Sequence, residues 1–448
     1  MKRVICIFLS LIMVLSLTAL VGCKEEKPQI SGSKVDVTLD SEEEFFLDVP
    51  AELDGTTVQI ATWGSNDDFN KAQVYSDFTE TTGINIEFVQ VPQAEYIVKL
   101  TSLISADQAP DVVTENGDFP RTLKVLRPID KETTGIDLSD PFWDSGVVNM
   151  YTVGGKPYIV ESVKSCWNNS GAITYYHKTV LEENGIKSPE QLIKENNWNL
   201  DSFINLLEKI KGSVSLSREP ASVAVDCWTS MYRAKQIEWD PTTSTFKNTV
   251  TSATMRESLR KLMELKDSGL VKIIDNHDDD ITKGTCVVQI CGAYGLRTSP
   301  GWFYTMDVDD LGFTYLPKIN ADDTDYPVVA SGHAYGLVRG SRNPKGAGIY
   351  LRYYLNEDHV PLESGFKNEE ALAFYKELRA KTDYSTVTFN RGVRMITDPD
   401  SSNGSMLKTV IDSTAAQIAV NLQTCDNVIN GAVAQANTLI EEIIQRDK

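Results

Sequence analysis

The sequence predicts an α/β protein whose main sheet is largely parallel and covered by helices. Three observations favour this class. Short β-rich runs alternate with amphipathic helical segments from residue 56 onward, the order begins β-α-β-α-β, and 41% of the 448 residues are hydrophobic. Strands that alternate with helices indicate a parallel sheet with helices on its faces. A chain of this length suffices for two domains with cores of their own.

The first five elements follow from the periodicity of apolar residues. TTVQIATW predicts a strand over residues 56 to 63, and INIEFVQV alternates strictly over residues 84 to 91. Helical periodicity covers residues 68 to 81 and residues 96 to 106, and a third short strand begins at Pro110.

Capping residues and strand patterns continue this alternation along the chain. Ser188, Pro189 and Gln191 have the pattern of a capping box, and Asn199 precedes a helical apolar stripe. The remaining predicted elements are strands over residues 284 to 291, 311 to 316 and 328 to 338 (interrupted at Gly332), a helix from Asn343 onward, and a mostly helical tail from residue 406 that only Gly431 interrupts.

The amino-terminal segment has the composition of a secretory signal peptide. Lys2 and Arg3 precede an almost wholly apolar run over residues 4 to 21, which is the charged-then-apolar order of such signals. An uncleaved membrane helix is the alternative, because the run is barely long enough to span a bilayer. We expect residues 1 to 22 to be the signal peptide.

The end of this run indicates lipid attachment. Leu20-Val21-Gly22-Cys23 resembles the lipobox of bacterial lipoproteins, in which the signal is cut before the cysteine and the thiol carries a diacylglycerol. Two acyl chains hold a protein on a membrane where one does not. The acidic stretch that follows has little apolar periodicity, so residues 23 to 50 are predicted to be a lipidated Cys23 and a flexible tether.

Charge narrows the class of partners. The formal net charge is −20, and loss of residues 1 to 22 removes two basic residues and no acidic ones, which leaves 41 basic and 63 acidic residues and a charge of −22. Such a surface repels nucleic acid and anionic lipid. We therefore expect no nucleic-acid partner.

Motifs for metal, cofactor or nucleophilic chemistry are missing from the sequence. It contains no CxxC, HExxH, GxSxG or P-loop pattern, and the acidic residues 275 to 280 lack the Gly and distal Glu of a calcium loop. We expect no cofactor and no metal. The cysteines beyond Cys6 and Cys23 are expected to be mostly or all buried free thiols; they are Cys166, Cys227, Cys286, Cys291 and Cys425.

Residues 174 to 210 resemble a segment of the extracellular solute-binding proteins of bacterial ABC importers, family 1, the maltose-binding type. The shared pattern is a Tyr-Tyr strand, a short helix ending in Glu-Asn-Gly, a helix led by Pro, and a Trp followed by Asp and Phe. Three further stretches keep the order of that family: Trp63-Gly64 after the first strand, residues 111 to 130, and residues 332 to 344. The likeness runs from about residue 56 to 355 and does not name the ligand.

The resemblance implies a periplasmic-binding-protein-like (type II) fold, with two α/β lobes, a hinge and an interlobe cleft. Lobe 1 would comprise residues 51 to 165 and 330 to 360, and lobe 2 would comprise residues 166 to 329 and 361 to 448. General rules place the ligand in the same region, because ligands of open α/β sheets lie beyond the carboxyl ends of the strands and pockets favour domain interfaces.

Aromatic and polar residues near predicted strands or turns are the candidate ligand-binding residues, because a sugar offers apolar faces and many hydroxyls. In lobe 1 they are Trp63, Asn66, Asp67, Asn116 and Asp118, joined by His333 and Tyr335 of the returning strand. In lobe 2 they are Trp167, Asn168, Trp228, Tyr294, Arg297 and Trp302.

Each candidate has a structural alternative. A Trp more often packs in a core, a His is more often satisfied within the fold, and Asn116 and Asp118 with Gly117 have the composition of a turn. Trp143, Trp198 and Trp239 are interpreted as structural.

These features together predict a lipid-anchored, non-enzymatic binding protein on the extracellular face of a bacterial membrane. We expect a monomer that captures an oligosaccharide or related carbohydrate by hinge closure and delivers it to the permease of an ABC transporter. Two alternatives stay open: a surface glycoside hydrolase that uses paired carboxylates, and a ligand sensor for a membrane kinase.

Overall fold

The computed structural model describes residues 49 to 448, except residues 63–70, 93–94, 166–170, 214–218, 275–280, 297–305, 331–332, 358, 360–365, 367 and 398–406. The predicted signal peptide, Cys23 and most of the predicted tether therefore lie outside the described residues.

The first of two five-stranded sheets has the order β2-β1-β3-β14-β6. β1 pairs in parallel with β2 and β3, whereas β14 runs antiparallel to both β3 and β6. Four strands thus end at one edge of the sheet, where β14 begins. The strands are β1 (Thr57–Thr62), β2 (Asn85–Gln90), β3 (Val112–Asn116), β6 (Ile159–Val160) and β14 (His333–Leu337).

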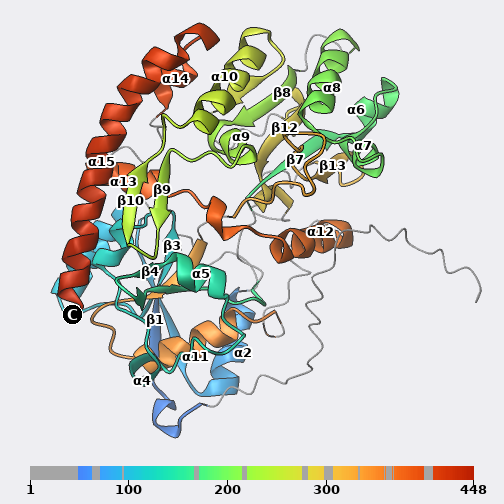
Figure 1. Cartoon of the computed structure of the whole chain (residues 1–448). Helices are drawn as coiled ribbons and strands as arrows, with labels where there is room; N and C mark the ends of the chain where they lie inside the picture. The colour runs from blue at the N-terminus through green and yellow to red at the C-terminus, as the bar shows by residue number, and fades with distance from the viewer. Residues whose placement is uncertain are drawn as a thin grey trace, which may run out of the picture. The chain divides into compact units, whose positions relative to one another are not determined.

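Helices cover this sheet as the apolar periodicity predicts. α2 (Lys71–Thr82) connects β1 to β2 and α3 (Tyr96–Ser105) connects β2 to β3, so the predicted β-α-β-α-β order is confirmed. α11 (Pro344–Tyr354) lies against β1 and α2 (Figure 1). The ring of Phe78 in α2 packs edge-on against Tyr350 in α11, with centroids 5.7 Å apart.

The second sheet has the order β11-β8-β12-β7-β13. β8 runs parallel to β11 and β12, while β7 runs antiparallel to β12 and β13. α8 (Leu200–Ser213) and α9 (Val225–Met231) pack on β8 (Figure 1). The strands are β7 (Ala172–His177), β8 (Glu219–Ala224), β11 (Lys272–Ile274), β12 (Cys286–Gly292) and β13 (Leu311–Thr314).

Two predicted helix starts are confirmed by their hydrogen bonds. α7 (Pro189–Lys194) begins with a complete capping box, in which the Ser188 hydroxyl accepts from the Gln191 N–H and the Gln191 side chain accepts from the Ser188 N–H. At α8 the Asn199 carboxamide oxygen accepts from the Ser202 N–H at 3.0 Å. Both caps satisfy donors that the first helical turn leaves free.

A β-hairpin follows α9 and includes Trp239, which a loop-like sequence surrounds. It pairs β9 (Ile237–Asp240) with β10 (Thr245–Asn248). The Trp239 indole N–H donates to the Met150 carbonyl at 2.8 Å, and its ring packs against Phe119 with centroids 5.2 Å apart. Trp239 is therefore structural, as expected, but it lies in a strand.

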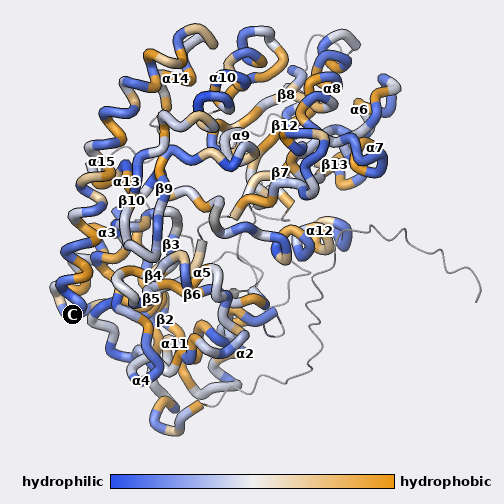
Figure 2. Tube along the Cα trace, in the orientation of Figure 1, coloured by the Kyte–Doolittle hydropathy of each residue, from blue (hydrophilic) through white to orange (hydrophobic). Residues whose placement is uncertain are grey.

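The 29-residue helix α15 (Ile418–Arg446) continues through Gly431, contrary to the interruption that the glycine suggested. One exposed glycine inside a helix costs only about 1 kcal/mol, which the packing of the helix offsets. Figure 2 shows hydrophobic and hydrophilic residues alternating along α15, in keeping with a helix that has one buried face.

Asparagine side chains join this helix and the hairpin. The Asn437 side chain accepts from the Phe246 N–H at 2.7 Å and donates to the Phe246 carbonyl at 3.0 Å. The Asn248 amide donates to the Asn430 side-chain oxygen at 2.9 Å. α15 thus takes the place of a neighbouring strand at the edge of β10.

The carboxyl end of α15 is fixed to the segment that follows β3. The Arg446 guanidinium donates to the Leu123 carbonyl at 2.9 Å and to the Leu126 carbonyl at 3.0 Å. Asp447 pairs with Arg446 at 2.7 Å and accepts from the Tyr158 hydroxyl. This end of the helix therefore packs with elements of the first sheet.

Three segments that connect elements of the two sheets lie side by side. They are residues 161–165 with residue 171, residues 328–330 and residues 381–389. The Ala330 N–H donates to the Thr386 hydroxyl at 2.9 Å, and further backbone hydrogen bonds join the segments through Gly171 to Val329 and Asp383 to Val328.

The other elements are shorter or lie at the surface. They are η1 (Ala51–Leu53), η3 (Arg121–Lys124), α4 (Lys131–Thr134), α5 (Ser145–Met150), β4 (Thr152–Val153), β5 (Lys156–Pro157), α6 (Lys178–Glu183), α10 (Ala253–Asp267), η4 (Ala293–Leu296), α12 (Glu369–Ala380), η6 (Tyr384–Thr386), α13 (Asn390–Thr397), α14 (Lys408–Ile411) and η7 (Ala415–Gln417).

One expectation from the sequence is tested by the described part of the chain. Its four free cysteines confirm the expected thiols, and three of them are buried: Cys286, Cys291 and Cys425, with Cys227 partly exposed. Among the helices of the described ranges, none has the length and apolar composition that crossing a membrane requires.

Candidate functional site

The topology gathers predicted site residues at one edge of the first sheet. β3 ends at Asn116, β14 begins at His333, and the register places these two residues opposite each other. Asp118 follows two residues after Asn116. Trp63, Asn66 and Asp67 follow β1, which ends at this edge, but they lie outside the described residues.

Asp118 is a buried carboxylate between two arginines. Its side chain is 6% exposed, and its Oδ1 lies 3.7 Å from Arg121 Nη1 and 3.8 Å from Arg391 Nε. Within the described residues Oδ1 accepts no hydrogen bond. Burial raises the pKa of Asp118, and Arg391 and Arg121 oppose this rise. The Asp118 Oδ1 atom therefore has two cationic neighbours but no hydrogen-bond donor among the described residues.

Glu115 holds the turn that presents Asp118. It is fully buried, and its carboxylate accepts from the Phe119 N–H at 2.9 Å and from the Thr122 hydroxyl. Burial raises the pKa of Glu115 to about 7, although the bond from Thr122 lowers it. The side chain is occupied by its own segment, so its role is to position the turn.

A similar edge occurs in the second sheet. Gly292 at the end of β12 pairs with Ala172 at the start of β7, and β8 ends beside them at Ala224. Tyr294 follows β12 within η4, which places its backbone at this edge. The predicted residues outside the described ranges are Trp167 and Asn168, which precede β7, and Arg297 and Trp302, which follow η4.

Asp226 is a carboxylate at this second edge that sequence reasoning missed. It lies in the first turn of α9, directly after β8, and is exposed. Its Oδ1 accepts from Gln236 Nε2 at 2.9 Å. Desolvation by the surrounding protein raises its pKa, while hydrogen bonds from Gln236 and Asn390 lower it. Two amide donors thus fix the orientation of an accessible carboxylate.

The first residues of α13 contact carboxylates at both sheet edges. Asn390 hydrogen-bonds Asp226 beside the second sheet, and its neighbour Arg391 pairs with Asp118 beside the first. Gly392 permits this approach, because a Cβ there would lie 2.0 Å from the Phe119 carbonyl oxygen. Asn390 and Arg391 were also missed, since nothing local in NRGVR separates a site residue from a helical surface.

Two predicted residues pack elsewhere. Trp228 is fully buried, and its indole N–H donates to the Ser258 carbonyl at 2.9 Å. Tyr335 lies within β14, and its ring packs edge-on against Tyr354 of α11, with centroids 5.9 Å apart. In this structure both rings belong to the packing of their own sheets, which agrees with the structural alternative.

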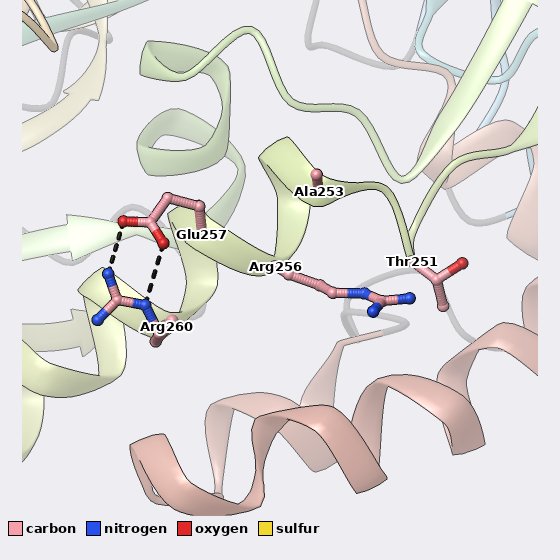
Figure 3. A pocket seen from close by; sticks show the side chains of 5 residues that line it. All are labelled: Thr251, Ala253, Arg256, Glu257 and Arg260. Atoms are coloured by element: carbon pink, nitrogen blue, oxygen red, sulfur yellow. Dashed lines mark hydrogen bonds and ion pairs between the residues drawn. The ribbon is translucent and has the colours of Figure 1, made fainter.

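A recess at the start of α10 lies away from these edges. Figure 3 shows Arg256 extending toward Thr251, while Glu257 and Arg260 face each other through two hydrogen bonds of 2.6 and 3.0 Å. Ala253 completes the lining, which contains no aromatic side chain. No metal-ligand cluster of His, Cys, Asp or Glu occurs among the residues that the structure describes.

Comparisons with known proteins find similarity to one protein family and to several solved structures. Residues 73–360 match the family model of the bacterial extracellular solute-binding protein. A comparison with curated proteins gives no significant match.

Solved structures share the fold at low sequence identity. The GacH receptor of Streptomyces glaucescens, solved unliganded and with acarbose, is 16% identical and has a TM-score of 0.54 over 88% of this chain and 99% of that chain. The galacto-N-biose-/lacto-N-biose I-binding protein of Bifidobacterium longum is 13% identical, with a TM-score of 0.59 over 85% and 98%. The Listeria monocytogenes substrate-binding protein Lmo0181, solved with cycloalternan, is 15% identical, with a TM-score of 0.56 over 84% and 98%.

Proposed function

Because the chain belongs to the family of bacterial extracellular solute-binding proteins, we propose that it captures an oligosaccharide or related carbohydrate and passes it to the permease of an ABC transporter. The predicted α/β fold is that of the solved binding proteins. In this role the chain binds and releases its solute without chemical change.

The observation that carries the carbohydrate proposal is the loosely paired Asp118. Its Oδ1 is 3.7 and 3.8 Å from two guanidinium nitrogens, which exceeds a good hydrogen bond. A sugar hydroxyl is both donor and acceptor, so it can donate to the carboxylate and accept from an arginine at the same time. An anionic ligand would instead meet Asp118 and Asp226 as like charges.

Asp226 is proposed to contact the same ligand from the second sheet. The two carboxylates are tied to adjacent residues of α13, Asn390 and Arg391. A ligand that contacts both sheets stabilises the arrangement of the two sheets that it binds more tightly. The size of this shift depends on the difference in its affinity for the two arrangements. We also propose that Asn116, His333 and Tyr294, with the predicted residues outside the described ranges, line the rest of the site.

The similar solved proteins support the choice of ligand class. Those proteins were solved with acarbose, cycloalternan and lacto-N-biose, and a cyclo/maltodextrin-binding protein of similar fold was solved with maltotetraose. At identities of 13 to 16%, this similarity supports the fold. Experiment must identify the particular sugar.

The cellular setting is proposed from the sequence. Residues 1 to 22 act as a signal peptide, Cys23 carries the lipid, and a tether up to residue 50 holds the binding domain outside the membrane. The lobes are proposed as residues 51–165 with 330–360, and residues 166–329 with 361–448. The three connecting segments described above then form the hinge.

Isothermal titration of the mature chain, with Cys23 replaced by Ser, tests the proposal. The panel comprises maltotetraose, acarbose, cycloalternan and lacto-N-biose. We expect one-to-one binding to at least one glycan, weakened about 10- to 100-fold by Asp118→Asn, because hydrogen bonds to a charged group contribute about 1.5 to 3 kcal/mol. Asp226→Asn should weaken binding similarly.

The matched control is Asp137→Asn, which changes a partly exposed aspartate that pairs with Lys131 and should leave binding unchanged. Absence of binding to every glycan in the panel would overturn the carbohydrate proposal. Appearance of reducing ends on incubation would instead favour the glycoside hydrolase. Unchanged affinity in both the Asp118 and Asp226 variants would refute the assigned site.

A further inference from the structure

An acidic and a basic side chain influence each other electrostatically where the connecting segments pass from one sheet to the other. Glu161 directly follows β6 of the first sheet. Arg379 lies in the last turn of α12, whose Tyr375 and Leu378 are buried in the same core cluster as Tyr175 of the second sheet. The pair therefore joins a residue of the first sheet to a helix that packs with the second.

The two charged groups are incompletely satisfied. Glu161 is 1% exposed, and its Oε1 accepts from the Ser162 N–H at 2.9 Å. Arg379 Nη2 donates to the Ser162 carbonyl. Glu161 Oε2 and Arg379 Nη1 are both buried, and neither has a hydrogen-bond partner within the described part of the chain. An unmade hydrogen bond on a buried charged group is costly.

Charged and polar groups from α12, α5 and its own segment surround Glu161. Arg379 of α12 lowers its pKa, Asp144 at the start of α5 raises it, and Ser165 of its own segment donates to it. Tyr384 of η6 donates its hydroxyl to Asp144. Burial outweighs the attraction of Arg379 and raises the pKa of Glu161 to about 7, so the carboxyl changes charge near neutral pH.

We propose that Glu161 and Arg379 form a pH-sensitive clasp across the connecting segments, which controls how the parts of the chain that carry the two sheets move relative to each other. The inference rests on the proposed hinge closure and names a regulation of it. An ionised Glu161 attracts Arg379 and favours the movement that joins the two unsatisfied atoms. A protonated Glu161 lacks that attraction and favours the arrangement seen here.

Small-angle X-ray scattering of the mature chain, with Cys23 replaced by Ser and without sugar, tests the clasp. The radius of gyration is measured between about pH 5.5 and pH 8.5 for the parent chain, Glu161→Gln and Glu115→Gln. Glu115 is the matched control, because its pKa is also raised to about 7 by burial, while its partners Phe119 and Thr122 lie in its own segment.

We expect the parent chain to change its radius of gyration with a midpoint near pH 7. Glu161→Gln should abolish the change and Glu115→Gln should retain it. A radius independent of pH in the parent chain would overturn the proposal, and so would a change that survives Glu161→Gln or disappears in Glu115→Gln. Because no sugar is present, these outcomes do not depend on the ligand proposal.

Hydrogen exchange of the parent chain gives a second test, should Glu161→Gln fail to fold. Between about pH 6 and pH 8, corrected for intrinsic exchange, residues 161–165 and 381–389 should change their protection together. Protection that is constant in both segments, or that changes in only one of them, would contradict the clasp.

Discussion

Replacing Glu115 with Gln removes one titrating group from the core and leaves its size almost unchanged. In the native structure the Glu115 carboxyl is fully buried, accepts hydrogen bonds from Phe119 and Thr122, and has a pKa of about 7. The Gln side chain retains one acceptor oxygen, and its NH₂ can donate to the Thr122 hydroxyl. The substitution therefore isolates the effect of ionisation.

The expected magnitude follows from the difference between the folded and unfolded pKa. The rise from 4.5 to about 7 corresponds to about 3 kcal/mol, at about 1.4 kcal/mol for each pH unit. Below pH 4.5 the group is protonated in both states and costs nothing. Between pH 4.5 and 7 the unfolded chain releases the proton first, so the free energy of unfolding falls as the pH rises and then levels off.

Urea unfolding at about pH 5, 6, 7 and 8 measures this dependence. Between pH 5 and pH 8, the free energy of unfolding should fall less in Glu115→Gln than in the parent. The difference between the two falls should reach up to about 3 kcal/mol. Glu161 adds a second contribution of the same sign, so the dependence should be reduced and not abolished. The exposed Glu132 provides the control Glu132→Gln. Parallel stability profiles for the parent and Glu115→Gln would refute the reasoning.

Three further substitutions are expected to change thermal stability, measured by calorimetry. Gly392→Ala should destabilise by about 3 kcal/mol, because its Cβ would lie 2.0 Å from the Phe119 carbonyl oxygen; an unchanged midpoint would argue against that close approach. Gly431→Ala, where a Cβ meets no atom within 4 Å, should stabilise by about 0.5 to 1 kcal/mol, and a loss would contradict an uninterrupted α15. Asn437→Ala should cost about 2 kcal/mol, because it removes both bonds to the Phe246 backbone; an unchanged midpoint would contradict a structural role for these bonds.

Much of the fold was predictable because its signals are local. The alternation in residues 84 to 91 and the Ser188 capping box depend on neighbours within a few positions, and both are confirmed. The hairpin around Trp239 and the continuity of α15 through Gly431 were not predicted. Both depend on partners distant in the sequence, such as Asn437 with Phe246 at a separation of 191 residues.

The candidate site was predictable only where it follows a strand. Asp118 could be selected because it comes directly after a predicted strand, and the structure places it at that edge beside Arg121 and Arg391. Asn390 and Arg391 contribute through tertiary contacts, and the residues around them have no distinguishing spacing. Trp228 could not be separated from a site residue in the sequence, since burial decides its role and burial depends on the whole second sheet.

The anchoring of α15 has a consequence for the order in which the chain acquires its structure. Arg446 bonds the carbonyl of Leu123 across 323 positions, so the segment after β3 lacks these partners until the residues of α15 have been synthesised. Contacts of such separation slow folding. The first sheet therefore completes its packing only after the residues of α15 have been made, a delay that suits the secretion we propose for this chain.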